Sequence, residues 1–350
     1  MQITRVERNG KAAGYRLEND RGMVVQIGTM GAAIERVELP GADKSRVNVC
    51  LNFADPADYA GNGLFAGAAV APVAGRIAGS RFAIGNKIYP LTPNENGVTC
   101  LHGGKVNASF LEWTILQSCV RDGEAKVGLS LVLPEDLEGF PGNRIFSATY
   151  KLDQENRLTV DYSAVSDRDT YVDMTNHAYF NFTGNFGASA LGQRLYVAAP
   201  SYMVSDEQNL PLALAPVDGT PFDYRKARIL FDAFETDPQN AQIQKARGLD
   251  HAFDVRAAAA AGEVLAELCD PASGRGVRIK SPTGRCMVVY TGGFIDESFT
   301  LAGGVTSSED CAVALECQSF PNAVNMPELE PKILRAGENY RHRIEYEFMF

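Results

Sequence analysis

Arg157–Ser163, the stretch RLTVDYS, places the apolar side chains Leu158, Val160 and Tyr162 at every second position, with polar residues between them. The C-terminal stretch 343–350, RIEYEFMF, repeats this pattern. Successive side chains of a β-strand point to opposite faces, so a period of two indicates strands with one buried face. This period dominates the chain and predicts an all-β fold.

Turn signals separate neighbouring strand candidates. Gly85-Asn86 lies between residues 81–84 and 87–91, and this two-residue sequence favours a β-hairpin. Short strands at this spacing favour an antiparallel sandwich or barrel over βαβ units. Three connections of this kind are predicted, at Gly85-Asn86, Gln154-Glu155-Asn156 and Pro271-Ala272-Ser273-Gly274.

Helix candidates are few and short. Residues 231–247 are interrupted by Pro238, and the alanine-rich residues 256–262 can form one or two helical turns or a loop. No GxGxxG or GxxxxGK[ST] motif supports a nucleotide-binding fold. A length of 350 residues gives a weak prior of about two domains, but no linker, repeat or change of composition marks a boundary. We therefore predict one large antiparallel β domain over residues 1–350.

The charge balance argues against polyanionic partners. The chain has 33 Lys and Arg against 43 Asp and Glu, a formal net charge of −10, and no basic block. We therefore expect neither nucleic acid nor an anionic membrane as a partner. The N-terminus lacks a secretory pattern, and the weakly polar stretch Leu64–Gly75 is too short to span a bilayer. Seven cysteines without CxxC spacing are typical of reduced thiols, so we expect a cytoplasmic protein.

Two of the four histidines have unusual neighbours. His102 precedes two glycines in CLHGG, which allows close backbone approach to a ligand or a strand. His177 lies in TNHAYFN, where amides and aromatic rings alternate, and this mixture suits a carbohydrate. Taken singly, each histidine is more typical of a structural residue that is hydrogen-bonded in a turn or strand. His251 and His342 carry no comparable signal.

Three charged residues are further candidates. Glu316 lies in the apolar stretch ALECQ, where burial would raise its pKa towards that of a general base, although a rim position facing water is equally compatible. Asp250 and His251 are adjacent, so in a strand at most one of them faces a given pocket. Arg76, in GRIAG, can bind neighbouring hydroxyls through its guanidinium fork or form an ordinary surface ion pair.

Motifs for metal and nucleophilic chemistry are absent. There is no HxH, HExxH or GxSxG pattern. His102, His177 and a carboxylate can converge from distant strands, an arrangement that sequence alone does not reveal. We expect no metal site.

Several segments together resemble one family, the aldose 1-epimerases or galactose mutarotases. Each motif is weak alone, but they occur in the family's order and span roughly residues 65–340. The segments are Gly75-Arg76-Ile77-Ala78 with Arg81-Phe82, Leu101-His102-Gly103-Gly104, residues 175–181 (TNHAYFN), residues 249–253 (LDHAF), Tyr290-Thr291-Gly292 and residues 315–325 (LECQSFPNAVN).

The resemblance implies a large antiparallel β-sandwich, the supersandwich of that family, with few short helices and an open face that holds a sugar. It implies interconversion of the α and β anomers of a free aldohexose such as galactose or glucose, without a cofactor. Glu316 matches the general base that takes the proton from the C1 hydroxyl. His177 matches the general acid that protonates the ring oxygen, and His102 matches a histidine that stabilises developing charge.

The resemblance also implies substrate contacts. Asp250 and Arg76 match residues that hold sugar hydroxyls, and we expect Asn176, Tyr179 and His102 to contribute as well. The partner is therefore a small monosaccharide, and the chain is expected to be a monomer or a homodimer.

The sequence departs from the family pattern beside the matched residues. Gly75 replaces a frequent Asn, Val288 replaces a residue that often contacts sugar, Gly293 replaces the Asn of YTGN, and Cys317 replaces a Thr. These changes leave the matched acid and base in place. They alter positions that contact sugar hydroxyls, and such contacts set which sugar is preferred.

Two alternative functions are compatible with the same fold. An epimerase for a hexose 6-phosphate needs two or more cations near C6, and Arg81 beside Arg76 is the candidate pair. A non-catalytic sugar-binding protein is expected to have lost the acid or the base, and this chain has both Glu316 and His177.

Overall fold

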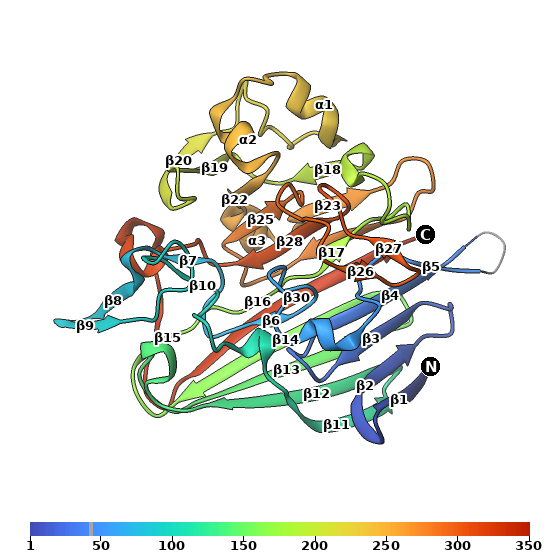
Figure 1. The fold of residues 1–350 in the computed structure, drawn as a ribbon, viewed down its shortest axis with the longest axis horizontal. Coiled ribbons are helices and arrows are strands. Elements are labelled where there is room, and N and C mark those ends of the chain that lie inside the picture. The colour runs from blue at the N-terminus through green and yellow to red at the C-terminus, as the bar shows by residue number, and fades with distance from the viewer. Residues whose placement is uncertain (42–44) are drawn as a thin grey trace.

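The computed structural model describes residues 1–41 and 45–350 and consists mainly of antiparallel strands (Figure 1). The largest sheet has nine strands, and the alternation predicted for 157–163 and 343–350 places two of them at its centre. In sheet order the strands are β11 (Thr114–Arg121), β12 (Glu124–Leu133), β13 (Arg144–Leu152), β14 (Arg157–Ser166), β30 (Asn339–Met349), β24 (Gly276–Lys280), β23 (Ala266–Cys269), β18 (Arg194–Val197) and β21 (Arg228–Ile229).

A six-stranded sheet carries the residues of greatest chemical interest. It packs on the nine-stranded sheet through aromatic rings: Phe180 lies 6.1 Å from Tyr346 and 5.9 Å from Phe348, measured between ring centroids. In sheet order its strands are β17 (Tyr179–Phe180), β28 (Val313–Gln318), β25 (Cys286–Tyr290), β22 (Asp250–Asp254), β19 (Ser201–Ser205) and β20 (Pro211–Pro216).

An N-terminal sheet lies beside β11–β14 (Figure 1). The Tyr150 hydroxyl, on β13, donates a hydrogen bond to the Ala32 carbonyl and joins the two layers. Stacked sheets with a shared apolar core form a β-sandwich, so the predicted fold class is confirmed. The strands of this sheet are β1 (Gln2–Arg8), β2 (Lys11–Glu18), β3 (Val24–Gly28), β4 (Ile34–Pro40) and β5 (Arg46–Asn48).

Short strand pairs complete the fold. Two of them, β7 with β10 and β6 with β16, hold loops that border the six-stranded sheet. The pairs are β7 (Arg76–Ile77) with β10 (Cys100–Leu101), β6 (Ala69–Val70) with β16 (Thr175–Asn176), β8 (Arg81–Ile84) with β9 (Lys87–Pro90), β15 (Thr170–Tyr171) with β29 (Ile333–Leu334), and β26 (Thr300–Leu301) with β27 (Val305–Thr306).

The predicted turns and breaks are confirmed. Gly85-Asn86 joins β8 to β9, residues 154–156 join β13 to β14, and residues 271–274 join β23 to β24. Pro238 lies between the two short helices of residues 230–246, because proline cannot continue a helix. The alanine run is helical and ends at Gly262, which has a φ of 69°. The helices are α1 (Leu230–Glu235), α2 (Ala241–Ala246) and α3 (Arg256–Ala261).

None of the helices among the described residues is long and apolar enough to cross a membrane.

Candidate active site

A cavity of about 380 Å³ lies over one face of the six-stranded sheet. Strand register determines which side chains enter it. Glu316 on β28 pairs with Val288 on β25, which pairs with Ala252 on β22. Asp250 lies two residues before Ala252 and therefore shares its face. All four side chains line the cavity.

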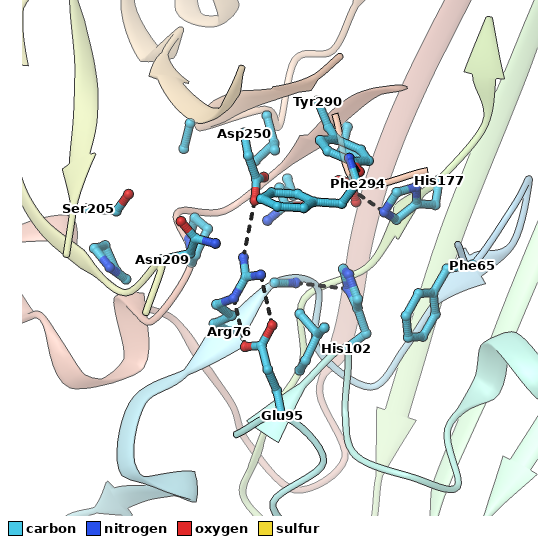
Figure 2. A pocket seen from close by; sticks show the side chains of 18 of the residues that line it. Phe65, Arg76, Glu95, His102, His177, Ser205, Asn209, Asp250, Tyr290 and Phe294 are labelled. Atoms are coloured by element: carbon cyan, nitrogen blue, oxygen red, sulfur yellow. Dashed lines mark hydrogen bonds and ion pairs between the residues drawn. The ribbon is translucent and has the colours of Figure 1, made fainter. Parts of the chain in front are cut away.

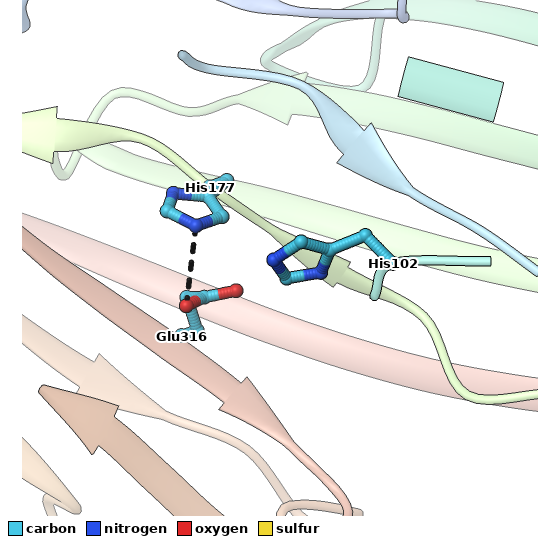
Figure 3. A group of neighbouring side chains, drawn as sticks. All are labelled: His102, His177 and Glu316. Atoms are coloured by element: carbon cyan, nitrogen blue, oxygen red, sulfur yellow. Dashed lines mark ion pairs between the residues drawn. The ribbon is translucent and has the colours of Figure 1, made fainter. Parts of the chain in front are cut away.

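His177 reaches the cavity from the connection between β16 and β17. Its backbone is fixed on both sides, because its N–H donates to the Ala68 carbonyl and its carbonyl accepts from the Gly67 N–H, each at 2.9 Å. Its side chain points at Glu316 (Figure 3), with 3.4 Å between Nε2 and Oε1. The two groups are in contact at this distance, and a small approach would bring them to hydrogen-bond length.

His102 approaches from the loop after β10, in a backbone conformation with a φ of 50°. A Cβ on the following residue, Gly103, would lie 2.4 Å from Cδ of Pro72, so only glycine fits there. The Gly75 N–H donates to Nδ1 of His102 at 3.2 Å. Because Nδ1 accepts this bond, the proton of the neutral ring is on Nε2, and His102 is a hydrogen-bond donor to the cavity.

Burial determines the protonation of the three groups. It raises the pKa of Glu316 well above its ordinary range, with Asp250 adding to the rise and Arg76 opposing it. It lowers the pKa of His177 to about 4 and that of His102 well below its usual value. Near neutral pH both rings are therefore neutral, and the Glu316–His177 pair holds one exchangeable proton. The pair thus contains one acid and one base.

The same three residues have the composition of a metal-binding cluster. Their candidate ligand atoms all lie within 4.8 Å of one another. A metal-bound histidine normally donates its other N–H to an acceptor. Nδ1 of His102 instead faces the Gly75 N–H, which leaves Nε2 protonated and unable to bind a metal. The donor set therefore fits proton transfer better than metal binding.

Arg76 is held rigidly at the cavity wall (Figure 2). Its Nε and Nη2 donate to the two carboxylate oxygens of Glu95 at 2.8 and 2.9 Å, and its Nη1 lies 3.6 Å from Oδ2 of Asp250. A bidentate pair of this kind fixes the plane of the guanidinium. Glu95 is a site residue that the sequence did not indicate, because it lies in the loop 92–97 with no strand pattern around it.

The structure brings most of the predicted residues to this cavity, which is lined by Arg76, His102, His177, Tyr179, Asp250 and Glu316 among others. Tyr179 donates its hydroxyl to the Leu64 carbonyl at 3.1 Å, so its ring faces the cavity while its polar group is occupied. His251 and His342 do not line it. His251 packs against Phe222 instead, as expected if adjacent strand residues face opposite sides.

Asn176 requires a correction. It is fully buried, its amide donates to the Gly67 carbonyl, and its side-chain oxygen accepts from the Ala178 N–H. It does not line the cavity. Since it immediately precedes His177 at the end of a strand, its side chain points the other way, and it is removed from the proposed substrate contacts.

Other cavity residues were not identified from the sequence. For Gln318 a signal existed, because it lies two residues after Glu316 on the same strand face. For the rest, only the folded arrangement of distant segments reveals the position. They include Phe65, Met203, Ser205, Asn209 and Phe294. Tyr290 also lines the cavity, and for it a signal existed, because it belongs to the matched segment Tyr290-Thr291-Gly292 and lies two residues after Val288 on β25.

Comparison with known proteins agrees with this geometry. A family model described as aldose 1-epimerase matches residues 14–347. The chain is 32% identical over 337 residues to the aldose 1-epimerase of Escherichia coli K12, covering 95% of this chain and 94% of the relative. It is 32% identical over 340 residues to the galactose mutarotase of Mus musculus, covering 97% and 94%.

A solved structure shows the same architecture. The crystal structure of galactose 1-epimerase from Lactobacillus acidophilus superposes with a TM-score of 0.84 at 29% identity, covering 99% of this chain and 98% of that one. The family model and the curated relatives both extend over nearly the whole chain. The chain therefore belongs to the aldose 1-epimerase family.

Proposed function

We propose that this protein is an aldose 1-epimerase that interconverts the α and β anomers of a free aldohexose such as galactose or glucose. The observation that carries the proposal is the buried pair formed by Glu316 and His177, which line the cavity with Oε1 and Nε2 3.4 Å apart. Anomer exchange needs one proton acceptor at the C1 hydroxyl and one proton donor at the ring oxygen. This pair supplies both.

The reaction follows from the shared proton. Burial favours the arrangement with the proton on Glu316, and a small approach of the two side chains from 3.4 Å allows it to move to His177. The resulting carboxylate removes the proton from the C1 hydroxyl, the O–H electron pair forms the C1=O bond, and the C1–O5 pair leaves to O5, which takes the proton from His177. The aldehyde then rotates about C1–C2, and closure reverses both transfers.

His102 stabilises the charge that develops during ring opening. Its Nε2–H is oriented by the Gly75 N–H on the other side of the ring, and Phe65 packs on that ring with 4.5 Å between centroids. A donor held in place before the reaction stabilises a developing oxyanion more than a mobile one. Arg76 and Asp250 are positioned to hold the remaining hydroxyls.

The lining of the cavity favours a free sugar over a sugar phosphate. Among the described residues that line it, Arg76 is the one cation, and Glu95 already engages it. Three carboxyl groups, those of Glu95, Asp250 and Glu316, line the same space. Arg81, the second cation of the alternative hypothesis, is not among the lining residues. Because Glu95 already balances the charge of Arg76, a phosphate dianion would find no surplus positive charge in the cavity, and Asp250 would repel it.

We therefore expect the wild-type protein to have a kcat/KM for glucose at least roughly 10-fold higher than for glucose 6-phosphate, because like-charge contacts oppose the phosphate. Approach to anomeric equilibrium is followed for both sugars by polarimetry, with the buffer rate subtracted. A higher kcat/KM for glucose 6-phosphate would replace this proposal by the phosphate-specific epimerase.

Arg76→Ala is expected to raise KM for the sugar by roughly 10- to 100-fold, the range for losing hydrogen bonds to a charged group, with a smaller change in kcat. Arg81→Ala is the matched control, since it removes a neighbouring arginine outside the cavity. Steady-state rates over a range of sugar concentrations separate KM from kcat. An unchanged KM in Arg76→Ala would remove Arg76 from the substrate site.

The domain organisation, the cellular location and the oligomeric state are also proposals. We propose that residues 1–350 act as one domain, in the cytoplasm, as a monomer or homodimer. The core supports the first part, because one cluster of buried side chains extends from Leu17 to Phe348. The net charge of −10 supports a neutral monosaccharide as the partner rather than nucleic acid.

A further inference from the structure

Gln318 is a buried polar residue that the mechanism above does not use. It is the last residue of β28, it lines the cavity, and its exposed fraction is 1%. Neither its Oε1 nor its Nε2 has a hydrogen-bond partner among residues 1–41 and 45–350. An amide buried in this way destabilises the fold unless something binds it, so its presence beside the active site calls for a ligand.

The position of Gln318 relative to Glu316 limits which part of a ligand it can reach. The two residues are separated by one position on a strand, so their side chains project from the same face about 7 Å apart at the backbone. Their side chains have the same length. Across the sheet from Glu316 lie Val288 and then Ala252, which have no polar side-chain atoms. Along β28, the next hydrogen-bonding group beside Glu316 is therefore the Gln318 amide.

Gly75 leaves room for a ligand at this amide. A Cβ at position 75 would lie 3.3 Å from Nε2 of Gln318 and 3.1 Å from two carbons of Pro321, so any side chain there would crowd the amide. The φ of Gly75 is 72°, a conformation that glycine adopts without strain. The N–H of the same residue orients His102. The space beside Gln318 is thus adjacent to the groups that act on C1.

We propose that Gln318 binds the C2 hydroxyl of the sugar, with Oε1 accepting from the hydroxyl and Nε2 donating to its oxygen. This inference rests on the proposed function, since it takes Glu316 as the group at C1. C1 has two ring neighbours, and His177 occupies the side of O5. The other neighbour is C2, whose hydroxyl is next to the C1 hydroxyl held by Glu316. The preferred substrates are therefore aldoses with a free C2 hydroxyl, and 2-deoxyaldoses are disfavoured.

Gln318→Met tests this assignment, because methionine has a similar size and shape but forms no comparable hydrogen bonds. We expect its kcat/KM for glucose to fall by a factor of roughly 5–30, the effect of losing one or two hydrogen bonds. The value for 2-deoxyglucose should change less than about twofold, since that sugar makes no such bond. The control sugar 6-deoxyglucose keeps its C2 hydroxyl and should behave like glucose.

Stability provides a second readout. Because the amide has no partner within the described chain, we expect the urea midpoint of Gln318→Met to equal or exceed that of the wild type in the absence of sugar. Gln318→Leu serves as a second apolar variant with the same expectation.

Three results would overturn the assignment: equal losses on glucose and 2-deoxyglucose, no loss on glucose, or a lower urea midpoint in both variants. Failure of the proposed function would look different, because the wild type would then accelerate anomer exchange of none of these sugars.

Discussion

Glu316→Gln is expected to lower kcat for anomer exchange about 10²- to 10⁴-fold, the contribution of one positioned proton transfer. Glutamine has the shape of the glutamate side chain but cannot accept the proton of the C1 hydroxyl. The fold should persist, since Oε2 of Glu316 has no hydrogen-bond partner in the described part of the chain that an amide would disturb. Polarimetry over a range of sugar concentrations gives kcat, and circular dichroism checks the fold.

Glu35→Gln is a matched control for this variant. Glu35 is also a buried glutamate on a strand, β4, where it pairs with Arg8 at 2.7 Å, and it does not line the cavity. We expect its kcat to stay close to that of the wild type even if the protein becomes less stable. If Glu316→Gln kept near-normal kcat, the assignment of Glu316 as the base would be wrong.

His177→Asn is expected to reduce kcat by a similar factor, about 10²- to 10⁴-fold, because asparagine cannot deliver a proton to the ring oxygen. The same polarimetric assay measures the loss. The low pKa of His177, about 4, means that in the wild type the second proton enters the pair only in acid. Activity of the wild type should therefore persist from neutral pH down towards that value and fall as the pair becomes doubly protonated.

His342→Asn separates this effect from the loss of a buried histidine in general. His342 is also buried with a pKa lowered to about 4, its Nε2 lies 2.9 Å from the Cys317 carbonyl, and it does not line the cavity. We expect this control to lose stability but to keep most of its kcat. Near-normal kcat in His177→Asn would show that another group protonates the ring oxygen.

The strands were predictable because their signals are local. The alternation in 157–163, the hairpin at Gly85-Asn86 and the break at Pro238 each depend on neighbouring residues, and each is present in the structure. The sheet order was not predictable. Strand β30 lies between β14 and β24, and β28 lies between β17 and β25, and such pairings join segments far apart in the chain.

The site residues also divide into those that the local sequence indicates and those whose contacts form only in the folded protein. The motif around Glu316 indicated a candidate base, but its burial and its 3.4 Å contact with His177 depend on strands that meet only in the folded protein. Asn176 was expected to contact the sugar because it is polar and adjacent to His177. Strand geometry directs neighbouring side chains to opposite sides, so the two residues do not share the cavity. Glu95 lies in a loop, where no periodicity indicates the direction of a side chain, and its role in holding Arg76 became visible only from the contact.

The central claim is that the pair formed by Glu316 and His177 interconverts anomers. The most direct measurement is the optical rotation of freshly dissolved α-D-glucose and α-D-galactose, with wild-type protein and Glu316→Gln in parallel. We predict that the wild type accelerates the approach to the same final rotation in proportion to its concentration, while the variant is close to buffer. A wild-type rate no faster than buffer for both sugars, or equal rates for the two proteins, would contradict the claim.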